Sequence, residues 1–306
     1  MNYGMFRVAS ASLKIKVANP SYNANEIKNV IDTALKKHVR LLVTPELSIT
    51  GYTCADLFFS EDLYRQAELA LQDIVRYTRD ENIVVIVGMP VRFYNSLYNC
   101  AVVIFNGEIK GVVPKINIPN YSEFYEKRWF ASGKQFESYQ PINLAGYDTK
   151  IGNQIFDLGS GAVLGIEICE DLWVSNPPSS ELCLHGANII VNPSASDEYV
   201  SKAKYRYDLV SNQSARCMCS YIYSSAGVTE STTDLVFSGA TLICENGTML
   251  ACGKRFSREN EIIIADVDIE KLNTIRQKDT SFNNISSEIG FSGINVYNED
   301  NDLKYR

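Results

Sequence analysis

The sequence predicts an α/β protein in which helices cover β-sheets. Short apolar runs, typical of buried strands, alternate along the chain with segments whose apolar residues recur at helical spacing. Asn-Gly pairs at 106–107 and 246–247 each separate two strand-like runs and indicate tight hairpins. The chain has 306 residues, of which 45% are hydrophobic, so it can bury the core of a large α/β unit.

The elements follow in order from these patterns. In the first half we expect a helix over 27–35, a strand over 41–47, a helix over 63–78, a strand over 83–88, a hairpin from 95 to 108 and a strand over 111–117. In the second half we expect strands over 162–166 and 187–192, a helix over 204–217, a strand over 221–224, and a strand over 240–244 paired with 248–251.

The composition changes near residue 270. Residues 1–270 carry the alternating pattern, whereas residues 271–306 form a polar C-terminal tail, with a Gly/Ser/Asn-rich stretch over 281–295 and a charged run over 298–302. A solvated terminus and a packed interface arm both fit this composition. We therefore expect one domain over 1–270, followed by a tail.

Charge and cysteine usage exclude several classes of protein. A net charge of −7 argues against nucleic acid or an anionic membrane as the main partner. No apolar stretch approaches the length of a membrane span, and the N-terminus lacks a signal-peptide pattern. The eight cysteines lack CxxC spacing, and Cys217 and Cys219 are separated by one residue only. Reduced thiols in a cytoplasmic protein, without a metal site, fit this usage best.

Cys169 stands where an apolar run stops. The strand predicted over 162–166 is followed by Glu167-Ile168-Cys169-Glu170-Asp171, and a turn or helix is expected to begin at Asp171. A thiol on such a corner faces a pocket and lies near backbone amides that could stabilise an oxyanion. A buried structural cysteine is the alternative at this position.

Histidine is an improbable partner for this thiol. The chain has two histidines: His38 follows two lysines at the end of the first helical segment, and His185 precedes Gly186. Both positions are explained by helix termination, since cations and glycine favour helix C-termini. A thiolate in this chain therefore requires another base and another cation.

Two other strand ends supply these groups. Thr44-Pro45 ends one strand run and precedes Glu46, and Pro114 ends another and precedes Lys115. Each residue alone could be an ordinary loop residue. Taken with Cys169, however, the order Glu, Lys, Cys offers a general base, a cation for the oxyanion and a nucleophile.

This constellation resembles the nitrilase or carbon-nitrogen hydrolase superfamily, whose triad is Glu, Lys and Cys in this order. The resemblance runs from Phe6 to Val267, and several of its segments are similar to one subgroup, the N-terminal glutaminase domain of glutamine-dependent NAD synthetases. The segments that carry it are Ser48–Tyr52 with Asp56–Phe58, Asn120–Phe130, Cys169–Trp173 and Gly227–Val236.

The resemblance implies a four-layer α-β-β-α sandwich and the pairing of two sandwiches in a dimer. It implies Glu46 as the general base, Lys115 as the oxyanion and orientation residue, and Cys169 as the nucleophile that forms a thioester. The backbone amide of Glu170 would be a second oxyanion donor.

The resemblance also implies residues around the substrate. Those that bind glutamine would be Tyr121, Glu170, Trp173, Ser196 and Lys202, and those that line the mouth or brace the triad would be Tyr52, Phe124 and Glu126. Ordinary readings remain open: Glu126, Glu170 and Lys202 as surface residues, Trp173 as a core aromatic and Ser196 as a cap. Because the family often has arginine at position 202, a lysine there would replace a two-point contact by a point charge.

The resemblance implies a glutamine amidohydrolase that supplies ammonia for the ATP-dependent amidation of deamido-NAD. The partner would be a synthetase domain that uses ATP and Mg²⁺; the glutaminase domain itself would need no cofactor. No Ser-Gly-Gly-type phosphate loop occurs in this sequence, so we expect either an excised domain or a free-standing amidase. An ω-amidase or N-carbamoyl-amine hydrolase, and a catalytically silent assembly scaffold, remain the alternatives.

Overall fold

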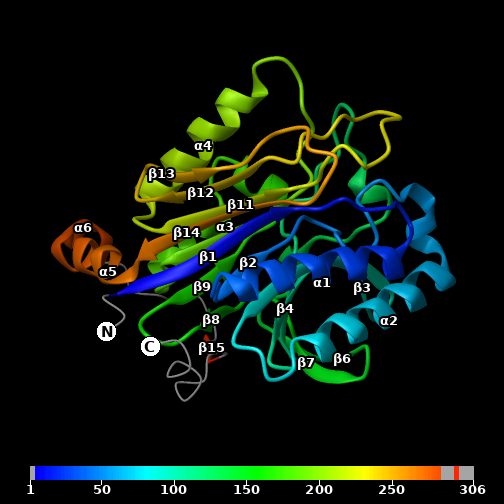
Figure 1. The fold of residues 1–306 in the computed structure, drawn as a ribbon, viewed down its shortest axis with the longest axis horizontal. Helices are drawn as coiled ribbons and strands as arrows, with labels where there is room; N and C mark the ends of the chain where they lie inside the picture. Colours follow the sequence, from blue (N-terminus) through cyan, green and yellow to red (C-terminus); the bar gives the residue numbers. More distant parts are fainter. Residues whose placement is uncertain (1–3, 284–292, 296–306) are drawn as a thin grey trace.

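The computed structural model of the chain describes residues 4–283 and 293–295. It contains two β-sheets stacked face to face, with helices on both outer faces (Figure 1). The polar tail that the sequence predicts lies largely outside the described residues, at 284–292 and 296–306. No helix in the described ranges is long and apolar enough to cross a lipid bilayer.

The first sheet has eight strands in the order β14-β1-β2-β3-β4-β5-β7-β6. Their bounds are β1 Met5–Ser12, β2 Leu41–Val43, β3 Val84–Phe93, β4 Ser96–Phe105, β5 Glu108–Pro114, β6 Gln140–Leu144, β7 Tyr147–Ile151 and β14 Glu261–Asp268. Strand β2 runs parallel to β3, and β4 is antiparallel to both β3 and β5. The carboxyl ends of β2 and β5 therefore point to the same edge of the sheet.

The second sheet has seven strands in the order β13-β12-β11-β10-β9-β8-β15. Their bounds are β8 Ile155–Asp157, β9 Val163–Ile166, β10 Ile189–Ser194, β11 Ser220–Ser225, β12 Thr241–Glu245, β13 Thr248–Cys252 and β15 Gly293–Asn295. Strands β9, β10 and β11 are parallel. Their carboxyl ends form a second edge that supplies functional side chains.

Helices complete the sandwich. The α-helices are α1 Pro20–Lys36, α2 Glu61–Tyr77, α3 Pro178–Leu184, α4 Lys202–Arg216, α5 Ile269–Lys278 and α6 Thr280–Asn283, and the short 3₁₀ turns are η1 Ala55–Phe59, η2 Glu126–Arg128, η3 Gly133–Gln135 and η4 Cys169–Leu172. Helices α1 and α2 pack together over the first sheet, and α3 and α4 cover the second (Figure 1). The predicted four-layer α-β-β-α sandwich is confirmed.

Local sequence signals explain the long helices. The side chain of Asn19 accepts a hydrogen bond from the backbone N–H of Tyr22, and Pro20 occupies the first turn of α1. Ser60 caps α2 in the same way, and two acidic residues follow it in the first turn. The buried residues of α2 recur at helical spacing and face the first sheet: Leu63, Ala67, Ala70, Leu71, Ile74 and Val75.

The core between the sheets is apolar. It consists of inward-facing residues from both sheets, among them Val8, Leu41, Ile86, Val191 and Ile222. The predicted Asn-Gly turns are present, since Asn106, Gly107, Asn246 and Gly247 all have positive φ. Close packing of the two sheets therefore fixes the loops at the edge of one sheet relative to the loops at the edge of the other.

The packed part of the chain continues past residue 270. Asp268 caps helix α5, since its side chain accepts from the backbone N–H of Lys271, and Leu272 within the helix is fully buried. The guanidinium of Arg276 donates to the backbone carbonyls of Cys217 (2.8 Å) and Met218 (3.0 Å). Helix α5 thus crosses the position at which the sequence placed the start of the polar tail.

Candidate active site

Three loops at the carboxyl ends of strands meet between the two sheets. Glu46 follows β2, Lys115 follows β5 and Cys169 follows β9, each within three residues of its strand. The backbone N–H of Glu46 donates to the carbonyl of Ser194 at the end of β10 (3.2 Å), which joins the edges of the two sheets. The three strand ends singled out in the sequence therefore converge.

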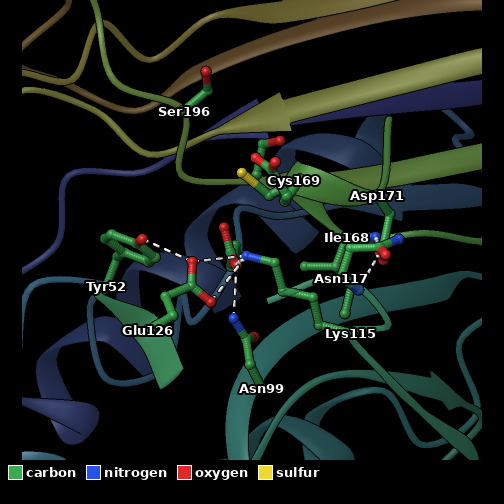
Figure 2. A network of polar contacts seen from close by, with 12 residues as sticks. Tyr52, Asn99, Lys115, Asn117, Glu126, Ile168, Cys169, Asp171 and Ser196 are labelled. Atoms are coloured by element: carbon green, nitrogen blue, oxygen red, sulfur yellow. Dashed lines mark hydrogen bonds and ion pairs between the residues drawn. The ribbon is translucent and has the colours of Figure 1, made fainter. Parts of the chain in front are cut away.

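Lys115 is a fully buried ammonium between two carboxylates. Its Nζ lies 2.7 Å from Glu46 Oε1 and 2.7 Å from Glu126 Oε1, and the side chain is 0% exposed. Glu126 also accepts from the hydroxyl of Tyr52 (2.8 Å). Figure 2 shows this chain of contacts running from Tyr52 through Glu126 to Lys115. Tyr52, Glu126 and Lys115 thus form one continuous chain of buried polar contacts.

Glu46 uses its two oxygens differently. Oε1 accepts from Lys115 and from the amide Nδ2 of Asn99 in β4 (2.6 Å). Within the described part of the chain, Oε2 is buried and has no hydrogen-bond partner. A buried carboxylate oxygen without a donor is costly unless it serves a function. Glu46 Oε2 is therefore free to receive a proton inside the site.

The charges of the site interact strongly. Burial raises the pKa of Cys169 well above its usual value; the negative charge of Glu46 raises it further, while Lys115 lowers it. Burial lowers the pKa of Lys115, but the two glutamates more than reverse this effect and raise it well above its ordinary value. Burial also raises the pKa of Glu126. Burial and the charge of Glu46 therefore favour the neutral thiol, while the two glutamates favour the charged form of Lys115.

The backbone at Cys169 is bent sharply. Its φ is 46°, in the left-handed region that L residues rarely adopt, and the short turn η4 begins there. The backbone N–H of Cys169 donates to Asn192 Oδ1 (2.9 Å), and that of Ile168 donates to Asp171 Oδ2 (2.9 Å). The same Asp171 carboxylate accepts from the backbone N–H of Asn117 (2.7 Å). The thiol thus stands on a corner that several hydrogen bonds hold in place.

This arrangement is suited to nucleophilic attack on an amide carbonyl. In such a reaction the thiol can act as the nucleophile, the free oxygen of Glu46 can take its proton, and the Lys115 ammonium can stabilise the negative charge that develops on the carbonyl oxygen. His38 and His185 lie at the ends of α1 and α3, as predicted, and take no part in the site. Among the described residues, no group of three or more His, Cys, Asp or Glu side chains could hold a metal ion.

Tyr121 and Glu170 form one wall of a hollow of about 680 Å³ on the surface. The Tyr121 hydroxyl donates to both carboxylate oxygens of Glu170 (2.9 and 3.0 Å), and its ring lies edge-on to Phe124. Burial raises the pKa of Glu170. Phe124 and Tyr52 also line a separate, smaller pocket with Trp129. Of the aromatic residues predicted around the substrate, Tyr121 contacts Glu170 and Phe124, whereas Tyr52 lies in the second pocket with Phe124.

Lys202 is not a solvated residue. It is the first residue of α4, is only 7% exposed, and forms an ion pair with Asp197. Its Nζ also lies over the rings of Trp173 (5.1 Å) and Tyr199 (4.9 Å). Ser196 is buried in the loop after β10. In the view of Figure 2, Cys169 lies between Ser196 and Lys115. The structure thus places an unforeseen counter-ion, Asp197, beside the predicted lysine.

Sequence reasoning missed the amides that hold the catalytic groups. Asn99 and Asn192 are buried polar residues within strands, and each bonds to one member of the predicted triad. A usable signal for Asn192 was its position immediately after an apolar strand run, before Pro193. Asn99 lies inside a strand, 53 residues from Glu46, so only the folded sheet brings the two together.

Comparison with known proteins gives a consistent result. The carbon-nitrogen hydrolase family model matches residues 7–277. The chain is 38% identical over 283 residues to a glutamine-dependent NAD(+) synthetase of Mycobacterium tuberculosis. The aligned region covers 92% of this chain and 41% of that protein. It is 30% identical to the corresponding synthetase of Saccharomyces cerevisiae, over 83% of this chain and 37% of that protein. The chain thus spans about two fifths of the length of these curated relatives.

Solved structures show the same relationship. A glutamine-dependent NAD(+) synthetase from Cytophaga hutchinsonii superimposes with a TM-score of 0.77 at 28% identity, over 86% of this chain and 43% of that one. An amidase from Nesterenkonia has the same fold, with a TM-score of 0.68 at 19% identity, over 90% of this chain and 97% of that one.

Proposed function

The chain belongs to the carbon-nitrogen hydrolase family, and we propose that it hydrolyses the side-chain amide of glutamine to glutamate and ammonia. The observation that carries the proposal is the buried Glu46–Lys115 pair beside Cys169, in which one carboxylate oxygen of Glu46 is free. Glutamine is favoured as the substrate because the relatives above are named glutamine-dependent and cover most of this chain.

In the proposed mechanism, Cys169 Sγ attacks the δ-carbon of glutamine while Glu46 Oε2 takes the thiol proton. Lys115 and the backbone amide of Glu170 stabilise the oxyanion of the tetrahedral intermediate. The carbon–nitrogen bond then breaks, and Glu46 transfers its proton to the departing nitrogen, which leaves as ammonia. Glu46 next deprotonates a water molecule, which attacks the thioester and releases glutamate. Glu46 then returns the proton to the thiol.

The amino-acid end of glutamine is proposed to lie between Lys202 and Glu170. Lys202 would face the α-carboxylate and the Glu170–Tyr121 pair the α-ammonium, with Trp173 and Ser196 closing the site. The support for this is two contacts: Tyr121 donates to Glu170, which follows Cys169 in the chain, and Lys202 lies over Trp173.

Ammonia released here is proposed to feed the ATP-dependent amidation of deamido-NAD. The partner would be a synthetase domain, which would bring the ATP and Mg²⁺ sites, since the relatives named as NAD(+) synthetases are more than twice as long as this chain. The chain supplied with glutamine, ATP, Mg²⁺ and deamido-NAD should yield glutamate but no NAD. Formation of NAD by the chain alone would contradict this division of labour.

The direct test is ammonia release from glutamine by the purified chain. Cys169→Ala should abolish it, and Glu46→Gln and Lys115→Met should each lower kcat by about three orders of magnitude or more, because the groups act as a unit. The matched control is Cys244→Ala, which removes another fully buried thiol, in β12, and should leave kcat unchanged.

Hydrolysis of a deaminated glutamine analogue or an N-carbamoyl amine in preference to glutamine would indicate the ω-amidase or carbamoylase alternative. A wild-type chain without any amidase activity would indicate a scaffold.

A further inference from the structure

We propose that Asn192 is a positioning residue that fixes the backbone of Cys169, and that Tyr221 acts through it. This inference rests on the proposed function only in naming Cys169 as the nucleophile. Within the part of the chain that the structure describes, neither Asn192 nor Tyr221 is hydrogen-bonded to Glu46 or Lys115, yet both belong to one buried chain of contacts that ends on Cys169.

The backbone at Cys169 needs an external restraint. A φ of 46° is unfavourable for a residue with a Cβ and persists only where surrounding contacts enforce it. The Cys169 N–H is satisfied by a side chain, Asn192 Oδ1 at 2.9 Å, rather than by the strand ladder. Asn192 is 0% exposed, so water cannot replace this acceptor. Removal of the amide would leave a buried N–H unsatisfied and free the corner to relax.

Two neighbours determine which way the Asn192 amide faces. Its Oδ1 also accepts from the hydroxyl of Ser194 (2.9 Å), and its Nδ2 donates to the hydroxyl oxygen of Tyr221 (2.9 Å). A flipped amide would turn an NH₂ group towards the Cys169 N–H, so that two donors would face each other. Tyr221 therefore helps to keep the acceptor of Asn192 directed at the nucleophile.

Tyr221 is itself held from the far side. Its hydroxyl donates to Glu167 Oε1, and Glu167 Oε2 accepts from the backbone N–H of Ser179 in the first turn of α3 (2.7 Å). Tyr221 and Glu167 are 0% and 1% exposed. The chain of contacts thus runs from helix α3 through two side chains to Asn192 and ends on the backbone of Cys169.

The reaction depends on this backbone because the amide that follows Cys169 is the proposed oxyanion donor. Rotation at Cys169 would move the thiol and the Glu170 N–H together, away from the substrate carbonyl. Removal of one oxyanion donor typically lowers kcat by about 10²–10³-fold. The contribution of Asn192 should therefore appear in kcat and not in KM, since the amino-acid end of glutamine is bound elsewhere.

The kinetic test uses Asn192→Ala and a matched control, Asn188→Ala. Asn188 is also a buried asparagine at β10, but at the opposite end of the strand, where it bridges Val163, Gly161 and Asn273. We expect Asn192→Ala to lower kcat for glutamine by about 10²-fold with KM changed less than about threefold. Asn188→Ala should lower the midpoint of thermal unfolding to a similar extent and leave kcat unchanged. Equal loss of kcat in the two variants would overturn the proposal.

The relay is tested by a double-mutant cycle. Tyr221→Phe should lower kcat by about tenfold, and the double variant Asn192→Ala/Tyr221→Phe should lose no more than Asn192→Ala alone, because Tyr221 acts only through Asn192. Tyr98→Phe is the control, since Tyr98 is also a buried tyrosine whose hydroxyl donates to a side-chain oxygen, Gln135 Oε1. Losses that multiply in the double variant would overturn the relay.

A spectroscopic measurement makes the result independent of turnover and of whether Asn192→Ala folds. In a chain labelled with ¹⁵N-cysteine, the Cys169 amide is identified as the signal lost in Cys169→Ala. Tyr221→Phe should shift this signal, while Tyr98→Phe should not. A Cys169 signal unchanged in Tyr221→Phe would overturn the proposal even if wild-type glutaminase activity is present. Absence of that activity with a shifted signal would instead contradict the proposed function alone.

Discussion

At the scale of single residues, the site holds one buried ammonium against two buried carboxylates and a thiol. Lys115 pairs with both Glu46 and Glu126, so its single positive charge does not neutralise both carboxylates. Glu126 is further satisfied by Tyr52, whereas one oxygen of Glu46 has no donor within the described residues. The two glutamates are therefore distinguished by their hydrogen bonds, which is why Glu46 is proposed as the base and Glu126 as a brace.

The charge of Glu46 should be measurable at Cys169. Burial and the neighbouring carboxylate both raise the pKa of the thiol. Glu46→Gln removes an anion that disfavours the thiolate, so the pKa of Cys169 should fall even though turnover is lost. The measurement is the pH dependence of Cys169 alkylation by iodoacetamide, followed by peptide mass spectrometry to separate the eight cysteines.

The expected result is a midpoint at lower pH in Glu46→Gln than in the wild type. Glu245→Gln is the control, because Glu245 is a buried carboxylate in β12 that pairs with Lys271, away from the thiol. An unchanged or higher midpoint in Glu46→Gln would show that the carboxylate does not control the ionisation of Cys169.

The ion pair of Lys202 with Asp197 gives a second residue-scale prediction. Lys202→Met should raise the KM for glutamine at least tenfold, about 1.4 kcal/mol, with kcat changed less than about threefold, because the lysine is proposed to contact the unreacting end of the substrate. Asp197→Asn is the matched control, since it breaks the same buried pair but keeps the cation. A similar rise of KM in both variants would mean that the pair is structural only.

At the scale of elements, the loops that carry Glu46 and Lys115 approach neighbouring backbone too closely for a side chain. A Cβ on Gly88 in β3 would lie 2.2 Å from the backbone nitrogen of Leu47 and 2.7 Å from the carbonyl oxygen of Pro45. A Cβ on Gly133 would lie 2.9 Å from the carbonyl oxygen of Lys115. Glycine at these two positions therefore sets the position of both triad loops by close packing.

Gly88→Ala should consequently displace Glu46. We expect kcat to fall by about 10²-fold, since a shift of about 1 Å at a catalytic group has an effect of this size. Stability should fall by about 1–3 kcal/mol through overpacking. Glutamine turnover and thermal unfolding are measured on the same sample.

Gly111→Ala in β5 provides the control for this substitution. Its Cβ would meet the ring of Phe156, 2.6 Å away, in the core between the sheets, not the backbone of a triad loop. It should lose stability but keep its kcat. If Gly88→Ala also kept its kcat, the close contact would not control the position of Glu46.

The sequence predicted those elements whose pattern is continuous. Strands β2, β3, β9, β10 and β11 are apolar runs buried on both faces, and the long helices α1, α2 and α4 have helical spacing. Strands β6 and β7 were missed because they form the polar edge of the first sheet, with few buried residues. Helix α5 was assigned partly to the polar tail because its sequence is charged and only Ile269, Leu272 and Arg276 are buried.

The site was predictable to the same extent. Glu46 and Lys115 follow parallel strands of the first sheet, whose carboxyl ends share one edge, so the meeting of these two could be inferred. Cys169 follows β9 of the second sheet, so its place beside them could be inferred from its chemistry only. The supporting amides of Asn99 and Asn192 could not, because a buried asparagine in a strand has no sequence pattern that names its partner. Such contacts are decided by strand register, which only the folded sheets establish.

At the scale of the whole molecule, the outer face of helix α4 is unusual. Val200 is 91% exposed and Tyr199 58% exposed, and Tyr205 and Tyr207 on the first turns of the helix are also largely exposed. Lys204, next to Tyr205, is exposed as well, whereas Arg206 is buried and pairs with Glu198. Exposed aromatics beside cations are typical of an interface core and its rim. The inner face of α4 meanwhile packs on β11 and β12, so the helix both covers its own sheet and presents this surface.

We therefore expect the chain to form a dimer through this face of α4, as the sequence resemblance implies. Light scattering at micromolar concentration should give twice the mass of 34.3 kDa. The double substitution Val200→Asp/Tyr207→Glu, which places charges in the contact without touching Tyr205 beside Trp173, should shift the species towards a monomer. Tyr94→Glu is the control, since Tyr94 is 89% exposed on the turn between β3 and β4 and should leave the mass unchanged. A monomeric wild type would contradict a constitutive dimer, whereas a dimer that survives the double substitution would place the interface on another surface.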